Sequence, residues 1–272
     1  MEIMIPAWYY AQQSADYTLR YPGEGYRGWT KADIPIDPAH TAVLVMHAWA
    51  IPPREDCPGI YRVCEYIPRS QEIIREYFPG FLDAVRKSGI RLIHIGSQTE
   101  NSLPALPGYQ RTLAKTPVEA GPAQIEADET LVKLRAFRSE NVFYDGTNKE
   151  DVKRAGELRD FAIMPQENED VACTSDQLFA LCREHGISHL IYTGFCVNAC
   201  LVMSPCGYID MARHGVMCSV VRDLTTAVEN AESCAVEGNK DYGLWAFALW
   251  GGFVFEKDTL MGTLLRPEDD KL

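Results

Sequence analysis

A cysteine at the junction of an expected strand and an expected helix is the residue of this sequence best suited to chemistry. Residues 190–193 form a short apolar run, Gly194 follows it, and Cys200 comes six residues after that glycine. A helix N-terminus carries unpaired N–H groups and a partial positive charge, which both favour a thiolate over a thiol. The same N–H groups can hold the negative oxygen that forms when sulfur attacks a carbonyl. The pattern therefore indicates a nucleophilic cysteine beside an oxyanion site.

Strand and helix patterns alternate along the chain, which is typical of an α/β domain with a parallel sheet. Continuous apolar runs indicate strands that are covered on both faces. We expect six of them, at residues 41–46, 91–95, 161–164, 190–193, 216–221 and 252–255. The patterns between them predict helices at residues 70–87, 175–185, 198–214 and 231–249. Pro79 and Gly80 predict a kink or two short helices in the first of these, and residues 205–207 interrupt the third. The predicted architecture is a three-layer sandwich, with a six-stranded, mostly parallel sheet and helices on both of its faces.

The remaining segments predict an arm and an insertion. Residues 1–40 are rich in Tyr, Trp, Pro and Gly, and we expect an aromatic arm that packs over the domain or over a neighbouring subunit. Residues 41–272 then form the α/β domain, interrupted by an insertion at about residues 101–160, where no clear period is visible. In parallel sheets, ligands bind beyond the carboxyl ends of the strands. The site is therefore expected among the segments that follow strands, at residues 47–49, 97–100, 165–170 and 194–200.

The composition narrows the classes of partner and compartment. The 272 residues include 26 Lys and Arg against 38 Asp and Glu, a formal net charge of −12. A surface that acidic repels a phosphate backbone, so we expect no nucleic-acid partner. No apolar run approaches the ~18 residues that cross a bilayer, and the first residues do not resemble a secretory signal. Because the nine cysteines are odd in number, they indicate reduced thiols, and we expect a cytoplasmic protein without membrane association.

Three motifs link these elements to a known superfamily: TAVLVMH at residues 41–47, LFALCREHGISHLIYTGFCVNAC at 178–200 and VVRDLTTA at 220–227. With them the chain resembles the isochorismatase-like cysteine hydrolases, which include nicotinamidases and N-carbamoylsarcosine amidases. The similarity covers roughly residues 38–262 in element order. It implies a Rossmann-like fold and, since members usually form dimers or tetramers, a homodimer or homotetramer.

The resemblance also implies three catalytic groups: a Cys that attacks an amide carbonyl carbon, an Asp after the first strand that takes the thiol proton, and a Lys after the third strand. Cys200 stands at the nucleophile's position, whereas His47 occupies the position of the Asp. The Lys should lie in residues 164–170, MPQENED, which contain no lysine. The superfamily also has a non-proline cis peptide before the nucleophile, and the matching bond here is Cys196–Val197.

A histidine in place of the aspartate indicates a rebuilt triad. Imidazole has an ordinary pKa of ~6.5, close to the working pH, where a general base is most useful. A Cys–His pair usually needs a carboxylate or an amide to orient the ring. We therefore expect Cys200 as nucleophile, His47 as base and Glu167 as the orienting carboxylate, with Glu169 as the less favoured choice.

Other residues near the strand ends are candidates for binding a substrate. Trp49 follows the predicted base, Gln98 follows the second strand, and the backbone of Val197 and Ala199 lies beside the nucleophile. Nicotinamidases place an Asp and histidines after the second strand to hold a metal, whereas residues 96–102 read GSQTENS here. Because this stretch contains no histidine, we expect no catalytic metal, and nothing else in the chain predicts a cofactor.

These features predict a metal-independent cysteine hydrolase that cleaves the C–N bond of a small amide-like molecule through a thioester. The alternative is a catalytically degenerate member that binds a ligand or serves in assembly, because two of the three expected groups are changed. A redox or thiol-exchange role is indicated only by the number of cysteines. Formation of an acyl-enzyme on Cys200 would distinguish the first possibility from the other two.

Overall fold

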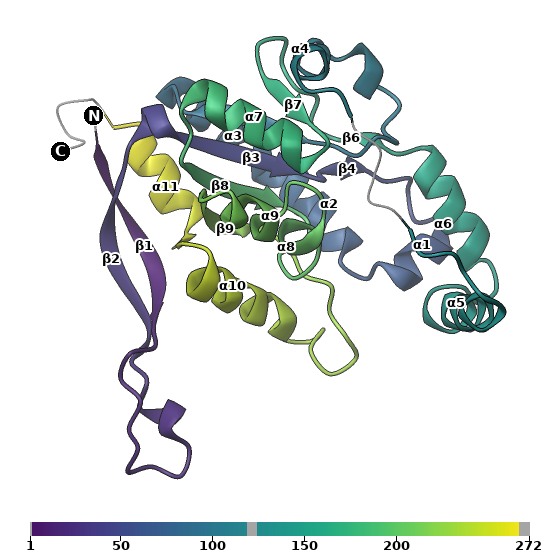
Figure 1. Ribbon diagram of the computed structural model, residues 1–272, viewed down its shortest axis with the longest axis horizontal. Coiled ribbons are helices and arrows are strands. Elements are labelled where there is room, and N and C mark those ends of the chain that lie inside the picture. Colours follow the sequence, from purple (N-terminus) through teal and green to yellow (C-terminus); the bar gives the residue numbers. More distant parts are fainter. Residues whose placement is uncertain (1, 119–123, 267–272) are drawn as a thin grey trace.

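One large sheet forms the centre of the molecule (Figure 1). The computed structural model describes residues 2–118 and 124–266. The sheet has the strand order β2-β1-β10-β9-β8-β3-β5-β7. The strands are β1 (Ile3–Ala11), β2 (Gly28–Ile36), β3 (Thr41–Met46), β5 (Arg91–Ile95), β7 (Asp170–Ala172), β8 (His189–Gly194), β9 (Met217–Thr225) and β10 (Val254–Phe255). The neighbours in the series β10-β9-β8-β3-β5-β7 are all parallel, whereas β1 and β2 are antiparallel to their neighbours.

The central strands are apolar because both of their faces are covered. Every residue of β3 and of β8 is buried, as expected for strands in the middle of a parallel sheet. The two strands pair in register from Thr41 and His189 to Met46 and Gly194. The α/β class and the mostly parallel sheet are thus confirmed.

Helices cover both faces of this sheet (Figure 1). One face carries α2 (Ile67–Glu76), α3 (Phe78–Ser88) and α11 (Lys257–Leu264). The other face carries α7 (Ser175–His185), α9 (Tyr208–Arg213) and α10 (Gly238–Trp250). At residues 70–87 the structure has two helices, one of the two alternatives expected from Pro79 and Gly80; Pro79 sits in the first turn of α3, where its missing N–H needs no partner. Within the described ranges, no helix combines the length and the apolar character needed to cross a bilayer.

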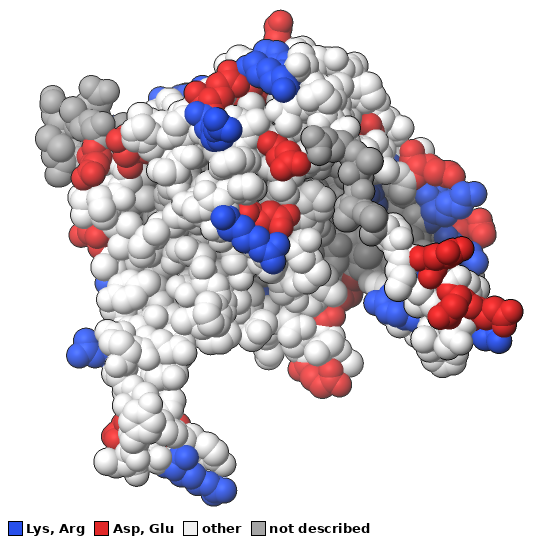
Figure 2. Space-filling view, viewed as in Figure 1, with Lys and Arg blue, Asp and Glu red and all other residues white. Residues whose placement is uncertain are grey.

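The segment expected as an arm contributes β1 and β2 to the sheet, which therefore has two strands more than the six that were expected. Strands β1 and β2 form an antiparallel hairpin, and β1 joins the parallel strands where Trp8 pairs with Val254. The indole of Trp8 also donates a hydrogen bond to Glu256 at 2.9 Å. The hairpin extends well beyond the rest of the molecule (Figure 1). On the face shown in Figure 2, acidic and basic side chains are interspersed, and much of the hairpin stem is uncharged.

The segment expected as an insertion is mainly helical. It contains the short 3-10 turn η3 (Leu103–Ala105) and the helices α4 (Pro107–Lys115), α5 (Glu129–Val142) and α6 (Asn148–Glu157). Helix α6 packs against α1 (Pro58–Val63), which precedes α2. Two further 3-10 turns, η1 (Pro22–Gly25) and η2 (Pro38–His40), lie in the hairpin loop and before β3. The insertion thus places α6 beside the carboxyl end of β3.

The third strand of the parallel sheet is not the one that was predicted. Residues 161–164 do not enter the large sheet; β6 (Asp160–Phe161) instead pairs with β4 (Trp49–Ala50) in a separate two-stranded sheet. The strand that pairs with β5 is β7, which has only three residues in a polar stretch. So short a strand gives little apolar signal, and the nearby run at residues 161–164 is the stronger pattern.

Candidate active site

Cys200 lies where the sequence placed it, at the start of a helix that follows β8. Gly194 ends the strand with a φ of 107°, and a Cβ there would lie 1.9 Å from the carbonyl oxygen of Met46. The cis peptide falls between Phe195 and Cys196, so the predicted bond, Cys196–Val197, is wrong by one residue. Helix α8 (Cys200–Met203) has only four residues. The helix-dipole effect expected from the sequence is correspondingly small.

The backbone N–H groups of the turn that leads to Cys200 differ in whether they have a partner. The N–H of Val197 donates to the carbonyl of Thr226 at 2.8 Å, and that of Ala199 donates to the carbonyl of Cys196 at 3.1 Å. By contrast, the N–H groups of Cys196, Asn198 and Cys200 have no acceptor among the residues that the structure describes. Of the N–H groups expected to hold an oxyanion, near Ala199 and Cys200, that of Ala199 is therefore occupied within the protein.

Three thiols and a tyrosine surround this turn. Cys200 is half-buried and acts electrostatically on Cys64, Tyr66 and Cys196. Tyr66 in turn interacts with the thiols of Cys64 and Cys196. Burial raises the pKa of Cys64, and it raises the pKa of Cys196 to about 12. These two neighbours of Cys200 therefore stay protonated near neutral pH.

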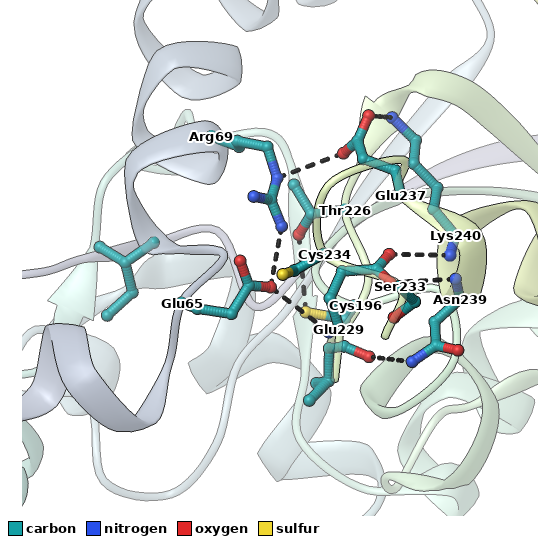
Figure 3. A network of polar contacts seen from close by, with 12 residues as sticks. Glu65, Arg69, Cys196, Thr226, Glu229, Ser233, Cys234, Glu237, Asn239 and Lys240 are labelled. Carbon is teal, nitrogen blue, oxygen red and sulfur yellow. Dashed lines mark hydrogen bonds and ion pairs between the residues drawn. The ribbon is translucent and has the colours of Figure 1, made fainter. Parts of the chain in front are cut away.

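A network of polar contacts holds the start of α2 against the segment after β9 (Figure 3). Arg69 bridges Glu65 at 2.8 Å and Glu237 at 3.2 Å. Glu65 also accepts a bond from the N–H of Glu229 at 3.3 Å, and the buried Glu229 carboxylate accepts from the first N–H groups of α10 at 3.0 Å. Because Glu65 lies between Cys64 and Tyr66, the network fixes both beside Cys196.

A cavity opens between α1, α2, α6 and the carboxyl end of β3. Its volume is about 80 Å³, which is room for a few water molecules or a very small organic group. Apolar side chains dominate its walls, and the two polar side chains contributed by α2 are occupied by bonds within the protein. The lining consists of His47, Trp49, Ile51, Ile60, Cys64, Tyr66, Ile67, Ser70, Gln71, Ile74, Val152, Ala155, Gly156, Arg159 and Phe195.

His47 lines this cavity as a neutral imidazole. The residue has a left-handed φ of 52°, which histidine adopts more readily than most non-glycine residues. Its ring stacks on Trp49, with centroids 4.6 Å apart, and its Nδ1 is buried without a partner. Burial, and secondarily the guanidinium of Arg159, lowers the pKa of His47 to about 4. Within the described residues no hydrogen bond joins the ring to Cys200, and Cys200 is not among the residues that line the cavity.

Glu167 is not the carboxylate that orients this ring. It precedes β7, and its neighbours Gln166 and Glu169 line a hollow together with Arg91, the first residue of β5. In a parallel sheet this is the amino end of the strands, opposite to His47. The prediction is wrong because the strand beside β5 is β7 and not residues 161–164, so residues 165–169 precede the strand instead of following it.

Glu169, the less favoured choice, is occupied elsewhere. Its carboxylate bonds Arg86 at 2.7 Å and the buried His94 at 2.8 Å. Burial alone would raise the pKa of Glu169, but the bonds from His94 and Arg86 outweigh it and lower this pKa to about 2. This ion pair belongs to the packing of α3 against β5.

The other predicted binding residues differ in their placement. Trp49 lines the cavity, and its indole N–H donates to Glu100 at 2.7 Å. Gln98 is exposed and outside the cavity lining, whereas Val197 is fully buried in the core. No group of three or more His, Cys, Asp or Glu side chains in the described residues is arranged to hold a metal ion.

Three titratable side chains of the cavity were not predicted from the sequence: Cys64, Tyr66 and Arg159. The guanidinium of Arg159 lies 4.0 Å from the centroid of the Trp49 ring. Arg159 follows α6, at the end of the insertion, directly before β6. Only the pairing of β6 with β4 brings it to Trp49, and neither two-residue strand is visible as a sequence pattern. Cys64 and Tyr66 lie in the turn between α1 and α2. No sequence pattern there pointed to a site, and the turn offered only a cysteine without an expected role.

No protein-family model and no curated protein matches this chain. Solved structures do align with it, among them a cysteine hydrolase from Pseudomonas syringae pv. phaseolicola, with 12% identity over 84% of this chain and 94% of that one and a TM-score of 0.48. An isochorismatase-like hydrolase from Alkaliphilus metalliredigens has 17% identity over 82% and 97% of the two chains, with a TM-score of 0.43. A pyrazinamidase from Pyrococcus horikoshii, in complex with zinc, has 12% identity over 80% and 98%, with a TM-score of 0.37.

These structures bear the names of the superfamily that the sequence motifs resemble. With identities below 25% and TM-scores below 0.5, they assign neither a substrate nor a catalytic residue to this chain. Its chemistry has to be argued from its own side chains.

Proposed function

We propose that this protein is a cysteine hydrolase that cleaves the C–N bond of a small amide-like molecule through a thioester on Cys200. The sulfur attacks the carbonyl carbon, and an S–C bond forms while the carbonyl oxygen becomes an oxyanion. The C–N bond then breaks, and the amine or ammonia leaves with the proton that the thiol gave up. Water attacks the thioester next, which releases a carboxylic acid and restores the thiol.

One observation carries this proposal: the N–H groups of Cys196, Asn198 and Cys200 have no acceptor in the turn that carries the half-buried Cys200 thiol. Donors that are fixed before the reaction stabilise an oxyanion without reorganising, and removing one such donor typically costs ~10²–10³-fold in rate. The neighbouring N–H groups of Val197 and Ala199 are held by carbonyls, which keeps the turn rigid. Backbone donors in protein interiors are usually paired, so several unpaired N–H groups in the turn before a cysteine favour a site that receives an acceptor from a ligand.

His47 is the proposed base, acting through an intervening water molecule or substrate group. Its neutral imidazole can accept the thiol proton and return it to the leaving amine. With a pKa of about 4 it is a weak base in the unliganded protein, so the free thiol is poorly activated and reactivity is expected to rise when a substrate occupies the cavity. Glu167 has no part in this proposal, because it lies at the opposite edge of the sheet.

Mass spectrometry of the intact protein tests the proposal directly. The chain is incubated with amides and ureas, quenched in acid, and searched for an acyl adduct on Cys200 and for released ammonia. Cys200→Ser should abolish thioester formation and turnover, whereas Cys234→Ser, which removes an exposed thiol on the α10 side, should change neither. If Cys200 stays unmodified and no ammonia is released, the protein is the non-catalytic ligand-binding alternative.

A further inference from the structure

The side-chain amide of Asn198, in the turn that leads to Cys200, pairs with the backbone of Val228. Its Nδ2 donates to the carbonyl of Val228 at 2.9 Å, and its Oδ1 accepts from the N–H of Val228 at 2.9 Å. Such a pairing needs a donor and an acceptor on one planar group, which a carboxylate or an alkyl side chain does not have. Few residue types other than asparagine can therefore tie the turn to Val228 through both bonds.

Val228 is itself held in place, in the segment that follows β9. Its carbonyl also accepts from the side-chain amide of Asn239 at 3.1 Å. The carboxylate of the next residue, Glu229, binds the N–H groups of Asn239 and Lys240, each at 3.0 Å. The N–H of Glu229 donates to Glu65 at 3.3 Å (Figure 3). The partner of Asn198 is thus anchored to the start of α10 and to the segment before α2.

The same segment binds the turn at a second point. The N–H of Val197 donates to the carbonyl of Thr226 at 2.8 Å, and the sulfur of Cys196 lies 3.5 Å from the Thr226 hydroxyl oxygen. Together with the Asn198 amide, these contacts hold three consecutive residues of the turn against one segment. They do so without using the N–H groups of the turn that have no acceptor in the described residues.

The two bonds of the Asn198 amide matter more for the local geometry than for the fold. Both are exposed to solvent, where a hydrogen bond adds little net stability because water competes for the same groups. The strand before the turn is held independently, since β8 pairs with β3 on one side and with β9 on the other. An oxyanion donor, by contrast, has to be placed within a fraction of an ångström, and a misplacement of about 1 Å can lower a rate by ~100-fold.

Resting on the proposed function, we propose that Asn198 is a positioning residue for the attack of Cys200 on a carbonyl carbon. Its amide fixes the turn so that the unpaired N–H groups receive the oxyanion as it forms. The side chain acts through the backbone of the turn and not by binding the substrate. Its loss should slow those reactions of the Cys200 thiol that pass through an oxyanion and leave its other reactions unchanged.

The test compares two probes that react with one thiol through different transition states. With p-nitrophenyl acetate, the sulfur adds to the carbonyl carbon, an oxyanion forms, and the C–O bond then breaks to release p-nitrophenolate. With iodoacetamide, the sulfur displaces iodide in one step and no oxyanion forms. In both reactions the thiol proton passes to the buffer.

Acid-quenched peptide mass spectrometry of the full chain measures both rates at Cys200 and at Cys234, which is exposed and serves as the reference thiol. Dividing the acylation rate by the alkylation rate removes the difference in nucleophilicity between the two thiols. In the wild type this ratio should be at least about tenfold higher at Cys200 than at Cys234.

Variants of Asn198 show whether the preference depends on its amide. Asn198→Ala should lower acylation of Cys200 by about tenfold or more and leave alkylation within about twofold of wild type. Asn198→Asp keeps the shape of the side chain but cannot donate to the Val228 carbonyl, so it should lower acylation as well. The control Asn141→Ala removes an exposed amide that donates to a backbone carbonyl in α5, and it should change neither rate. Thermal melts establish that each variant is folded.

The outcomes separate this inference from the proposed function. Equal losses of acylation and alkylation, or a preference that survives both variants, would refute the role of Asn198 and leave the cysteine hydrolase proposal standing. If the preference depends on Asn198 but the wild type hydrolyses no amide or urea, Asn198 positions an oxyanion site and the proposed hydrolysis fails. If the ratio at Cys200 equals that at Cys234, the turn stabilises no oxyanion and both proposals fall.

Discussion

The buried imidazole of His47 makes the stability of this protein depend on pH in a way that a single substitution should reveal. The side chain is only 8% exposed, and its Nδ1 has no partner. Protonating it in the folded protein places a charge in a site that burial and Arg159 both oppose. We therefore expect His47→Asn, which cannot titrate and tolerates the left-handed φ of 52°, to flatten the acid limb of the stability curve.

The sign and size follow from linkage between proton binding and folding. The pKa of His47 falls from 6.5 to about 4 on folding, so the unfolded chain binds the proton more tightly. The stabilisation is complete above pH 6.5 and is lost as the pH falls toward 4. At 1.36 kcal/mol per pH unit, His47 lowers the free energy of unfolding of the wild type, relative to neutral pH, by about 2 kcal/mol at pH 5 and about 3 kcal/mol at pH 4.

The assay is urea unfolding, followed by tryptophan fluorescence, of both proteins between pH 7.5 and pH 5. Other acid-sensitive groups are present in both chains, so the difference between the two curves isolates His47. His189→Asn is a positive control, because burial lowers the pKa of His189 to about 4 as well. If wild type and His47→Asn lose stability in parallel from pH 7.5 to pH 5, His47 is not a buried neutral imidazole, and its role as the proposed base falls with it.

Two further predictions concern the framework of the site. Gly194→Ala should destabilise the protein by about 3 kcal/mol or more, because the new Cβ would lie 1.9 Å from the Met46 carbonyl oxygen at a φ of 107°. The control Gly156→Ala adds a Cβ in open space and should melt within a few degrees of wild type. Equal melting temperatures for the two variants would contradict the argument. Glu229→Gln should lower the free energy of unfolding by about 1 kcal/mol, since an amide has one oxygen for the two N–H groups that the carboxylate binds at the start of α10. Denaturant unfolding of this variant and of the control Glu232→Gln measures the loss. Equal stabilities of the two variants would show that the Glu229 carboxylate does not stabilise the start of α10.

The position of Cys200 could be predicted because its signal is local. A buried strand, a glycine and a fixed spacing lie within one short segment, and the structure keeps all of them in register. The sheet was predictable for the same reason, since β3 and β8 are continuous apolar runs. The backbone N–H groups that stay free in the turn could not be predicted, because they depend on which N–H groups bond to carbonyls of other segments. Only the bonds of Val197 and Ala199 show which N–H groups remain free.

The rest of the site is assembled by contacts between distant segments, which one sequence does not reveal. Arg159 reaches Trp49 through the pairing of two very short strands. Glu167 was misplaced because β7 is too short and too polar to stand out beside the apolar run at residues 161–164. A carboxylate that precedes a strand and one that follows it lie at opposite edges of a parallel sheet, so a shift of a few residues along the chain moves a side chain across the whole domain.

The low pKa of His47 has two causes, and a single substitution should separate them. Burial is the first cause and the guanidinium of Arg159 is the second. Arg159→Met removes the charge and keeps an unbranched side chain over the ring of Trp49, so the pKa of His47 should rise while burial keeps it below 6.5. NMR titration of the imidazole in the full chain measures this change, with Arg135→Met, on the exposed helix α5, as the control. No rise in Arg159→Met would mean that burial alone sets the pKa of His47, and a rise of equal size in both variants would mean that Arg159 has no specific effect on it.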